Sequence, residues 1–413
     1  MRRTRNAILA GFTGLILACS VSGTASATAT AGAPAAAEEN YAEVSLPSPV
    51  PFGAGTRAAP AAPALQAAAD ASCAERQKAA KSAYSCVEMK TTPAVKEYFR
   101  QERRETSQRL VPSGTETFNS ACGSSFADQW YYSNKFTMCF QYGFIWLINN
   151  PNGTPRSQVQ FAVHQQISHV VNGGANYTYE TWITPVSGNG DLLVGGGITS
   201  SLACSTGCTT KDTLPGEQPV VLKRKLYGNF RISQPTSSNQ FTFTVQRFDA
   251  VLSAPSAGPL PISFLQTPVT RCDSGFSERS KTTGCVFRDA PGVYGLSVSD
   301  SAVNETAAHI LDAQQRLAGH PGRFGDGSAL TYESDKKKQE ANRRAVCGKF
   351  VPLPTGSCDE YPFASTDQGG NPATVSVQDV DLDDNTRAGG RLGNMYQQSR
   401  LLDGEAYWAV ITA

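Results

Sequence analysis

The 413-residue sequence lacks any apolar run long enough to cross a bilayer as a helix. Such a helix needs about 20 consecutive apolar residues, and the marked apolar run at residues 7–18 is shorter. We therefore expect no membrane span. Charge is also scarce, because Asp, Glu, Lys and Arg make up only 17% of the residues and the formal net charge is +1. This total charge does not indicate generic electrostatic adhesion to nucleic acid or to membrane surfaces.

Paired cysteines at zinc-site spacing are missing as well. The nearest two, Cys204 and Cys208, have no second pair at such a spacing, whereas a structural zinc ion needs four clustered ligands. Of the 11 cysteines, ten remain if an N-terminal segment with Cys19 is removed, and ten can pair completely. Other connectivities stay open, but pairing between neighbours predicts structural disulfides at Cys73–Cys86, Cys122–Cys139, Cys204–Cys208, Cys272–Cys285 and Cys347–Cys358.

Residues 1–27 have the layout of a secretory signal peptide. Three arginines precede the apolar run, and the small-residue triplet Ala25-Ser26-Ala27 follows it. A lipoprotein signal is the alternative, because the same run ends in Cys19. Residues 28–72 are dominated by Ala, Pro, Gly and Ser, a composition that cannot bury a core and indicates a linker or a cleaved pro-segment. We expect a secreted, extracellular protein that matures in an oxidising environment.

Residues 73–300 are expected to form a β-rich domain, sandwich or barrel-like, with a short helical start. From Cys73 to Arg104 the composition predicts a pair of short helices with their boundary at Pro93. From about residue 117 to 298, β-branched and aromatic residues alternate in runs that Gly, Pro and Asn separate. No motif in this region identifies a ligand.

Residues 301–413 change texture and are expected to form a small α+β domain, so the chain is multidomain. Asn304 or Ser301 is a candidate cap for the first helix and Ser334 for the second. The pattern predicts helices at 305–317 and 335–346, strands at 349–352, 374–380 and 407–412, and a glycine-broken helix at 387–399.

The densest polar cluster of this domain is Cys358-Asp359-Glu360-Tyr361-Pro362. Two adjacent carboxylates beside a predicted disulfide are candidates for acid–base or metal chemistry. If the segment is extended, they point to opposite faces, so we expect only one of them to lie deep in any one site. The alternative is that the pair lies in a loop and faces water.

A second polar cluster begins with Asp383-Asp384-Asn385 and continues with Arg387, Arg391 and Asn394. Aspartate and asparagine oxygens are suitable ligands for Mg²⁺, which takes few protein ligands and keeps several waters. The alternative is a helix start, in which Asp384 or Asn385 is the cap and Asn394 faces solvent.

The order and spacing of these motifs resemble the NucA/NucB family of secreted bacterial deoxyribonucleases. The resemblance covers about residues 305–413. It rests on the following segments, in this order: His309-Ile-Leu-Asp-Ala, His320-Pro321, Asn342-Arg-Arg, Cys358-Asp-Glu-Tyr-Pro-Phe-Ala, Gly369-Gly370, Asp384-Asn385, Gly389-Gly390, Gly393-Asn394 and Asp403-Gly404.

The resemblance implies a small mixed fold and a metal-dependent endonuclease that cuts DNA without strong sequence preference. Asp359 then takes the role of general base, and Glu360 supports Mg²⁺ or Mn²⁺ through water. Asn385 and Asn394 are the implied metal ligands. The resemblance also implies that Arg387 or Arg391 contacts the phosphate. His309 is implied to support catalysis, and a purely structural role is the alternative.

The implied partner is DNA, although residues 301–413 hold 11 Lys and Arg against 15 Asp and Glu, a net charge of −4. Affinity must then come from local basic patches and be sensitive to salt. Candidate patches are Lys336-Lys337-Lys338, Arg343-Arg344, and Arg387 with Arg391. Lys336 of the first patch and Arg343 of the second are expected to bind the substrate.

Two other functions remain open at this point. The β-rich region fits an adhesion or carbohydrate-binding module with an inactive nuclease-like tail, although the intact Asp359-Glu360 motif argues against inactivity. The chain also fits a delivered antibacterial toxin whose nuclease is the C-terminal domain.

Overall fold

The structure is a computed structural model, and the residues that it describes are 73–412 apart from 75, 79, 109–129, 171–173, 206, 213–215, 265 and 276–281. The predicted signal peptide and linker lie outside the described residues. Buried apolar side chains form one large cluster within residues 87–290 and another within 294–411. Within the described part of the chain, no helix has the length and hydropathy that a bilayer crossing requires.

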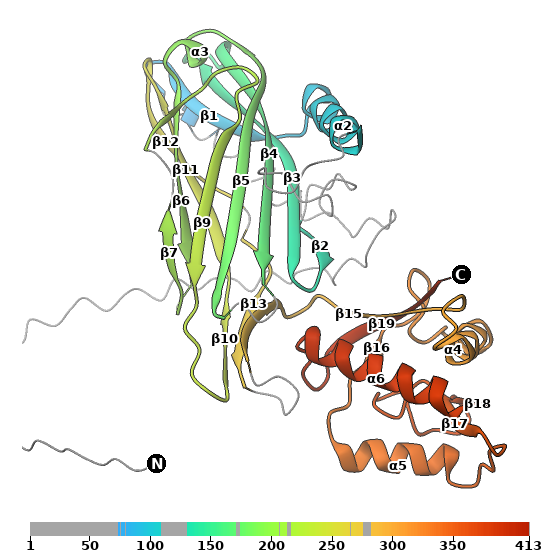
Figure 1. The fold of residues 1–413 in the computed structure, drawn as a ribbon. Coiled ribbons are helices and arrows are strands. Elements are labelled where there is room, and N and C mark those ends of the chain that lie inside the picture. The colour runs from blue at the N-terminus through green and yellow to red at the C-terminus, as the bar shows by residue number, and fades with distance from the viewer. Residues whose placement is uncertain are drawn as a thin grey trace, which may run out of the picture. The chain divides into compact units, whose positions relative to one another are not determined.

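A long antiparallel sheet dominates the first of these regions (Figure 1). Its longest strands are β3 (Thr137–Asn149), β4 (Pro155–His169) and β5 (Asn176–Asn189). The other strands are β1 (Tyr84–Met89), β2 (Tyr131–Asn134), β7 (Thr209–Asp212) and β9 (Leu226–Ser233). The strand order is β1-β3-β4-β5-β9-β7, with β2 paired to β3. Burial alternates residue by residue along β9, as expected of a strand with one face on a core.

Two smaller antiparallel sheets complete this region. One has the order β12-β11-β6-β8 and the other β10-β13-β14. Phe248 of β11 stacks on Tyr179 of β5 and on Phe264, with ring centroids 6.2 Å and 5.3 Å apart. The elements are α3 (Leu192–Gly195), β6 (Gly197–Cys204), β8 (Gln218–Pro219), β10 (Gln240–Thr244), β11 (Gln246–Ala254), β12 (Ala257–Ser263), β13 (Thr270–Ser274) and β14 (Thr283–Phe287).

The expectation of a mostly β region is confirmed. At its start the described residues of 73–78 are helical and a second helix begins at the predicted boundary, but the first helix ends earlier than predicted. Helix α2 (Pro93–Gln108) begins at Pro93, where a proline costs no helical hydrogen bond. Residues 84–89 instead form strand β1, which pairs with β3 along its whole length. Sheet pairing has therefore overridden local helix preference here. Val95 and Phe99 bury one face of α2 against Ala162 of β4.

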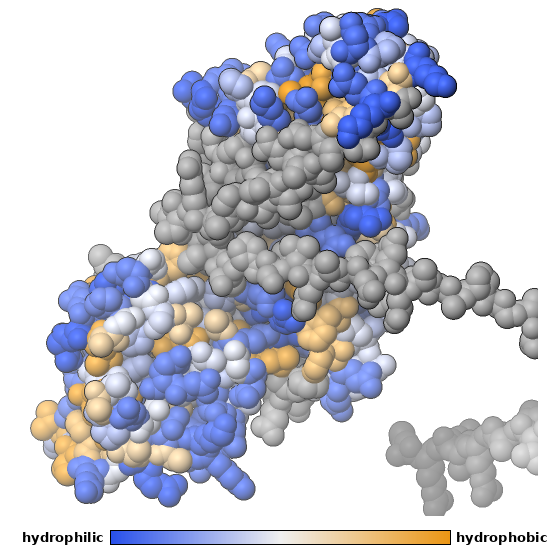
Figure 2. Space-filling model, turned by 180° about the vertical axis from the view of Figure 1, so that it is seen from behind, coloured by the Kyte–Doolittle hydropathy of each residue, from blue (hydrophilic) through white to orange (hydrophobic). Residues whose placement is uncertain are grey.

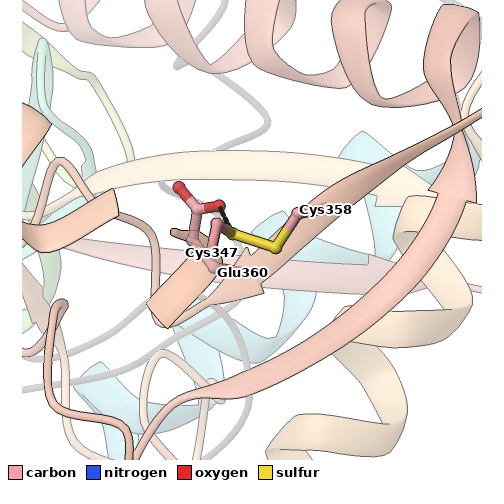
Figure 3. Close-up of side chains that lie close together, drawn as sticks. All are labelled: Cys347, Cys358 and Glu360. Carbon is pink, nitrogen blue, oxygen red and sulfur yellow. Dashed lines mark hydrogen bonds between the residues drawn. A yellow bond between two sulfur atoms is a disulfide. The ribbon is translucent and has the colours of Figure 1, made fainter. Parts of the chain in front are cut away.

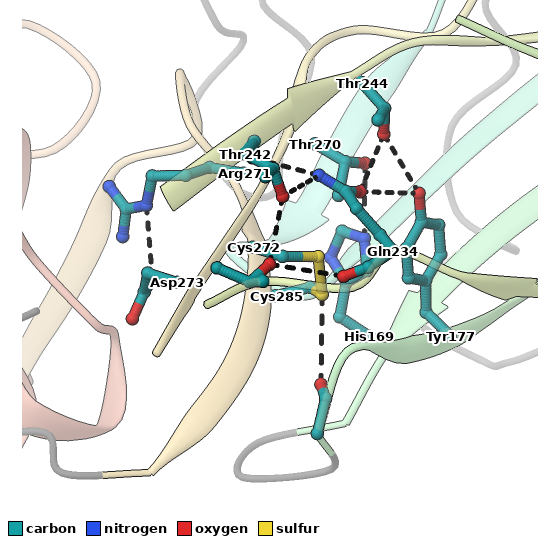
Figure 4. The surroundings of a disulfide bond; sticks show 12 residues. His169, Tyr177, Gln234, Thr242, Thr244, Thr270, Arg271, Cys272, Asp273 and Cys285 are labelled. Carbon is teal, nitrogen blue, oxygen red and sulfur yellow. Dashed lines mark hydrogen bonds and ion pairs between the residues drawn. A yellow bond between two sulfur atoms is a disulfide. The ribbon is translucent and has the colours of Figure 1, made fainter. Parts of the chain in front are cut away.

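A buried polar network surrounds the disulfide between Cys272 of β13 and Cys285 of β14 (Figure 4). Tyr177 exchanges hydrogen bonds there with Gln234 and Thr244, at 3.2 Å each. The ring atom Nε2 of His169 lies 3.3 Å from the hydroxyl of Thr270, whereas Nδ1 is buried and has no hydrogen-bond partner among the described residues. Burial lowers the pKa of His169 from 6.5 to about 3. His169 and His164 lie on opposite faces of β4, as their spacing predicts.

The C-terminal region combines three helices with five short strands. β15 (Gly292–Ser297) runs parallel to β19 (Ala406–Thr412), which also pairs with β16 (Leu330–Thr331). β17 (Gly356–Tyr361) and β18 (Ser376–Asp381) form an antiparallel pair. The helices are α4 (Asn304–Arg316), α5 (Lys336–Cys347) and α6 (Leu382–Gln398). The α+β expectation is met by these elements, but the predicted strand at 349–352 is wrong, because those residues form an irregular loop.

The helix caps differ from the predicted ones, and the cap of α4 depends on a tertiary contact. Asp381 caps α6 by accepting from the backbone N–H groups of residues 383 and 384, and Asp335 rather than Ser334 caps α5. No side chain of the preceding loop caps α4. Instead Asp384 of α6 accepts hydrogen bonds from the N–H groups of Glu305 and Thr306, at 2.9 and 3.1 Å.

Four of the five predicted disulfides are present, at Cys73–Cys86, Cys204–Cys208, Cys272–Cys285 and Cys347–Cys358. The fifth, Cys122–Cys139, involves Cys122, which lies outside the described residues. On the face drawn in Figure 2, the coloured residues are mostly hydrophilic with smaller apolar patches. The most exposed large apolar side chains of the C-terminal region are Val351 and Leu353, in the loop that the Cys347–Cys358 disulfide closes.

The low pKa of His169 predicts how stability depends on pH. The unfolded chain binds a proton at this residue below pH 6.5, whereas the folded chain does so only near pH 3. Stability is therefore fully present above pH 6.5 and is lost as pH falls, by up to about 1.4 kcal/mol per pH unit. His169→Gln should flatten the dependence of the melting temperature on pH between 4 and 6.5. Equal slopes in the variant and the parent would contradict this account.

Candidate active site

A pocket of about 340 Å³ opens between β17 and the helices α5 and α6. Two adjacent strand residues, Asp359 and Glu360, both line it and are both buried. The expectation that only one of the two carboxylates lies deep in one site is therefore wrong. The other lining residues are Tyr294, Thr306, Lys336, Gln339, Glu340, Arg343, Phe363, Ala364, Ser365, Asn385, Ala388, Gly389, Leu392, Gly393 and Tyr396.

Asp359 is held by a histidine from α4. The carboxylate Oδ2 lies 2.6 Å from His309 Nδ1, and His309 is almost fully buried. The other ring nitrogen, Nε2, lies 2.9 Å from the hydroxyl of Ser376 on β18. Arg316 also donates to that hydroxyl, at 3.2 Å. Both ring nitrogens are thus engaged, so the imidazole is fixed in place and fixes one oxygen of the carboxylate in turn.

Burial raises the pKa of Asp359 above its ordinary value. The hydrogen bond and the charge interaction with His309 oppose this shift, while the nearby carboxylate of Asp384 adds to it. A carboxylate with a raised pKa is a stronger base once it is ionised. The surroundings of Asp359 therefore suit a group that takes a proton from water.

Glu360 faces α5 rather than α4. Its Oε1 accepts from Arg343 at 3.1 Å, and its Oε2 lies 3.2 Å from the sulfur of Cys347 (Figure 3). Burial raises the pKa of Glu360, and the charge of Arg343 opposes that shift. Cys347, Cys358 and Glu360 bring three potential metal-binding atoms within 4.8 Å of one another. The two sulfurs are joined in a disulfide, however, so they supply no thiolate for a metal.

Of the predicted metal ligands, only some lie at this pocket. Asn385 lines it, and its Nδ2 donates to Ser357 Oγ at 2.9 Å and to the carbonyl of Cys358 at 3.3 Å. These bonds use the amide nitrogen, so the amide oxygen is the atom that can bind a cation. Asn394 is exposed and instead lines a second hollow on α6 with Met395. The expected placement of Asn394 beside Asp359 is therefore wrong.

The two predicted arginines of α6 also lie away from the pocket. Arg387 is exposed and pairs with Asp383 one turn earlier, at 3.4 Å. Arg391 pairs with Asp300 at 2.7 Å and lines the second hollow. Because α6 turns 100° per residue, these positions lie on a different face from Asn385 and Gly389. The basic residues that do line the pocket are Lys336 and Arg343 of α5.

Two polar residues near the pocket were not predicted as part of the site. Ser376 contacts His309, and Asp384 joins α6 to the start of α4. Asp384 stands out in the sequence as a possible Mg²⁺ ligand or as a cap for its own helix, but not as a cap for α4. Ser376 carries no signal, because only the fold brings it to His309.

Hard oxygen donors surround one side of the pocket, from Asp359, Glu360 and Asn385. Two buried carboxylates with raised pKa values gain most from a nearby cation, because a cation offsets the loss of hydration. Mg²⁺ and Mn²⁺ prefer carboxylate and amide oxygens. The donor set therefore fits one such ion.

Comparisons with solved structures give only weak similarities. The chain is similar to the GAE domain of GGA2p from Saccharomyces cerevisiae at 12% identity and a TM-score of 0.20, over 26% of this chain and 89% of that one. A FixG-related protein from Vibrio parahaemolyticus is 8% identical with a TM-score of 0.15, over 25% of this chain and 92% of that one. Such TM-scores carry no argument about fold or activity.

No curated protein matches the chain. A protein-family model does match, and its description is Deoxyribonuclease NucA/NucB. The match spans residues 322–410, which include Asp359, Glu360 and most of the pocket lining. The match thus covers the C-terminal region from β16 onward, but neither α4, which carries His309, nor any of the described strands β1 to β15. Residues 322–410 of this chain are accordingly a deoxyribonuclease domain of the NucA/NucB type.

Proposed function

We propose that the protein is a secreted, metal-dependent endonuclease that hydrolyses phosphodiester bonds of DNA without strong sequence preference. The observation that carries the proposal is the buried Asp359, held at 2.6 Å by His309 at the edge of a pocket that basic side chains also line. The disulfides fit an oxidising compartment. The intact arrangement of Asp359 and His309 favours an active domain over an inactive tail.

In the proposed mechanism Asp359 is the general base. His309 donates Nδ1–H to Oδ2, so Oδ1 is the oxygen that takes the proton from the attacking water. His309 touches the carboxylate and not the substrate, which makes it a positioning residue. Its hydrogen bonds to Asp359 and Ser376 limit rotation of the carboxylate and keep the base aimed at one point.

Glu360, through water, and the amide oxygen of Asn385 are the residues proposed to hold Mg²⁺ or Mn²⁺. When bound, the ion supplies positive charge that stabilises the phosphate oxygens as negative charge develops on them. Asn394, Arg387 and Arg391 are left out of this assignment because they lie on other faces of α6.

Lys336 and Arg343 are proposed to bind the phosphate in place of the α6 arginines. Both line the pocket and both are exposed, so they remain accessible to a polymer. Arg343 is held on Glu360 yet keeps 68% of its side chain exposed. Its planar guanidinium can engage that carboxylate and a phosphate oxygen with different N–H groups.

Asp359→Asn tests the base. The variant keeps size and hydrogen bonding but cannot take a proton, so DNA cleavage should slow by at least about 100-fold. The parent should cleave plasmid DNA. Its activity should be lost in the presence of a chelator and return when Mg²⁺ is added. Asp326→Asn, the same change at an exposed carboxylate in a loop, is the matched control and should keep the parent's rate. Undiminished cleavage by Asp359→Asn would refute the role of base.

Asn385→Ala tests the metal site. An ion held by one amide oxygen and by water should bind weakly, so activity should rise with Mg²⁺ into the millimolar range. Asn385→Ala should shift this titration to higher Mg²⁺, whereas Asn394→Ala should leave it unchanged. Thermal melts separate this effect from stability, because loss of the Asn385 hydrogen bonds costs about 1 kcal/mol. A lower melting point with an unchanged Mg²⁺ curve would remove Asn385 from the site.

Loss of the Cys347–Cys358 disulfide should lower activity without unfolding the β-rich region. The bond joins the last residue of α5 to β17. Because α5 buries none of its residues, its other attachments are polar contacts such as that of Asn342 with the carbonyl of Ala364, and the disulfide is its covalent link to the strand that carries Asp359. The double variant Cys347→Ala, Cys358→Ala should therefore lose most DNA cleavage. Cys204→Ala, Cys208→Ala removes a disulfide from the β-rich region and is the control. Equal activity in the two double variants would contradict a role of the Cys347–Cys358 disulfide in positioning the site.

A further inference from the structure

Helix α5 and the two residues that follow it hold most of the positive charge of the C-terminal region. Residues 336–349 contain six of the 11 Lys and Arg of residues 301–413 and only one acidic residue, Glu340. Their net charge is +5, whereas the remaining residues of 301–413 carry five basic and 14 acidic side chains, a net charge of −9. A polyanion that approaches this region is therefore attracted to α5 and repelled by much of the rest.

Four of the five cations of α5 fall into two rows. Lys336, Gln339, Glu340 and Arg343 line the pocket, which is the i, i+3, i+4, i+7 pattern of one helix face. Lys337 and Arg344 repeat the same spacing of seven residues one position later. They therefore form a second row, about 100° around the helix from the pocket row.

The second row is exposed and not neutralised by acids. Lys338 pairs with Glu333 at 2.9 Å, and Arg343 pairs with Glu360 at 3.1 Å. Lys337 and Arg344 are exposed and have no acidic partner among the residues that the structure describes. Since α5 buries none of its residues, neither side chain is needed for packing.

We propose that Lys337 and Arg344 form a second phosphate-binding row that holds the DNA backbone beyond the phosphate in the pocket. The inference rests on the proposed function and names the substrate as a polymer rather than a short fragment. Seven helical residues span about 10.5 Å. At 3.4 Å per nucleotide along a DNA strand, this is a reach of about three nucleotides. The row raises the affinity for long DNA and does not affect the rate of the chemical step at Asp359.

The test compares the full disulfide-bonded chain with the double variant Lys337→Gln, Arg344→Gln. Binding of a 20-base-pair duplex is measured in chelator, between 50 and 200 mM salt. Loss of two phosphate contacts should reduce the slope of log affinity against log salt by about 1.8. Over this fourfold salt range the variant's affinity should therefore fall about 12-fold less than the parent's. An unchanged slope would overturn the proposal.

The double variant Arg224→Gln, Arg231→Gln removes the same charge from exposed positions of the β-rich region and is the matched control. Its slope should equal the parent's, and an equal reduction would show an effect of total charge and overturn the proposal.

With Mg²⁺, the α5 variant should need more plasmid DNA for half-maximal rate but hydrolyse bis(p-nitrophenyl) phosphate at the parent's rate. A loss of both activities would also overturn it. If the parent cleaves neither substrate, the proposed function fails, while the binding slopes still decide on the row.

Discussion

The hydrogen bond between His309 and Asp359 ties the C-terminal region together around its pocket. It joins the middle of α4 to β17 in a buried setting, where an unpaired carboxylate is costly. Asp384 of α6 fastens the start of the same helix through two backbone N–H groups. Two carboxylates thus hold α4 at two points, and α4 holds the base in return. A site of this kind is rigid because its polar contacts are also its structural contacts.

Much of the architecture follows from local patterns in the sequence. Alternation of apolar residues predicts the strands of the β-rich region, and the helices of the C-terminal region begin and end within a few residues of their predicted limits, except that α6 starts earlier. The errors have physical causes. Residues 84–89 look helical in composition but gain more from pairing with β3. Residues 349–352 include a proline, are followed closely by another, and lie in a loop closed by a disulfide, so they have no strand partner.

The site could be predicted in part, since Asp359, Glu360, Asn385, Lys336 and Arg343 all line one pocket. What the motif alone does not specify is the rotation of α6. Ala388 and Leu392 are buried and therefore mark the inner face, from which Arg387, Arg391 and Asn394 diverge. A helix-phase argument from these two apolar residues would have separated Asn385 from the other three. Ser376 and the role of Asp384 as a cap for α4 depend on long-range contacts that no local pattern contains.

Gly389 lies on the wall of the pocket, in the middle of α6. A β-carbon built at this position meets nothing within 4 Å, so packing does not demand glycine there. Glycine within a helix costs about 1 kcal/mol relative to alanine. Because glycine has no side chain, the helical backbone is bare at this position. A second backbone can approach it more closely than it could approach any other residue type there. The wall of the pocket that α6 forms is thus uncharged and bare of side chains at Gly389, whereas the wall that α5 forms carries the charges of Lys336, Glu340 and Arg343.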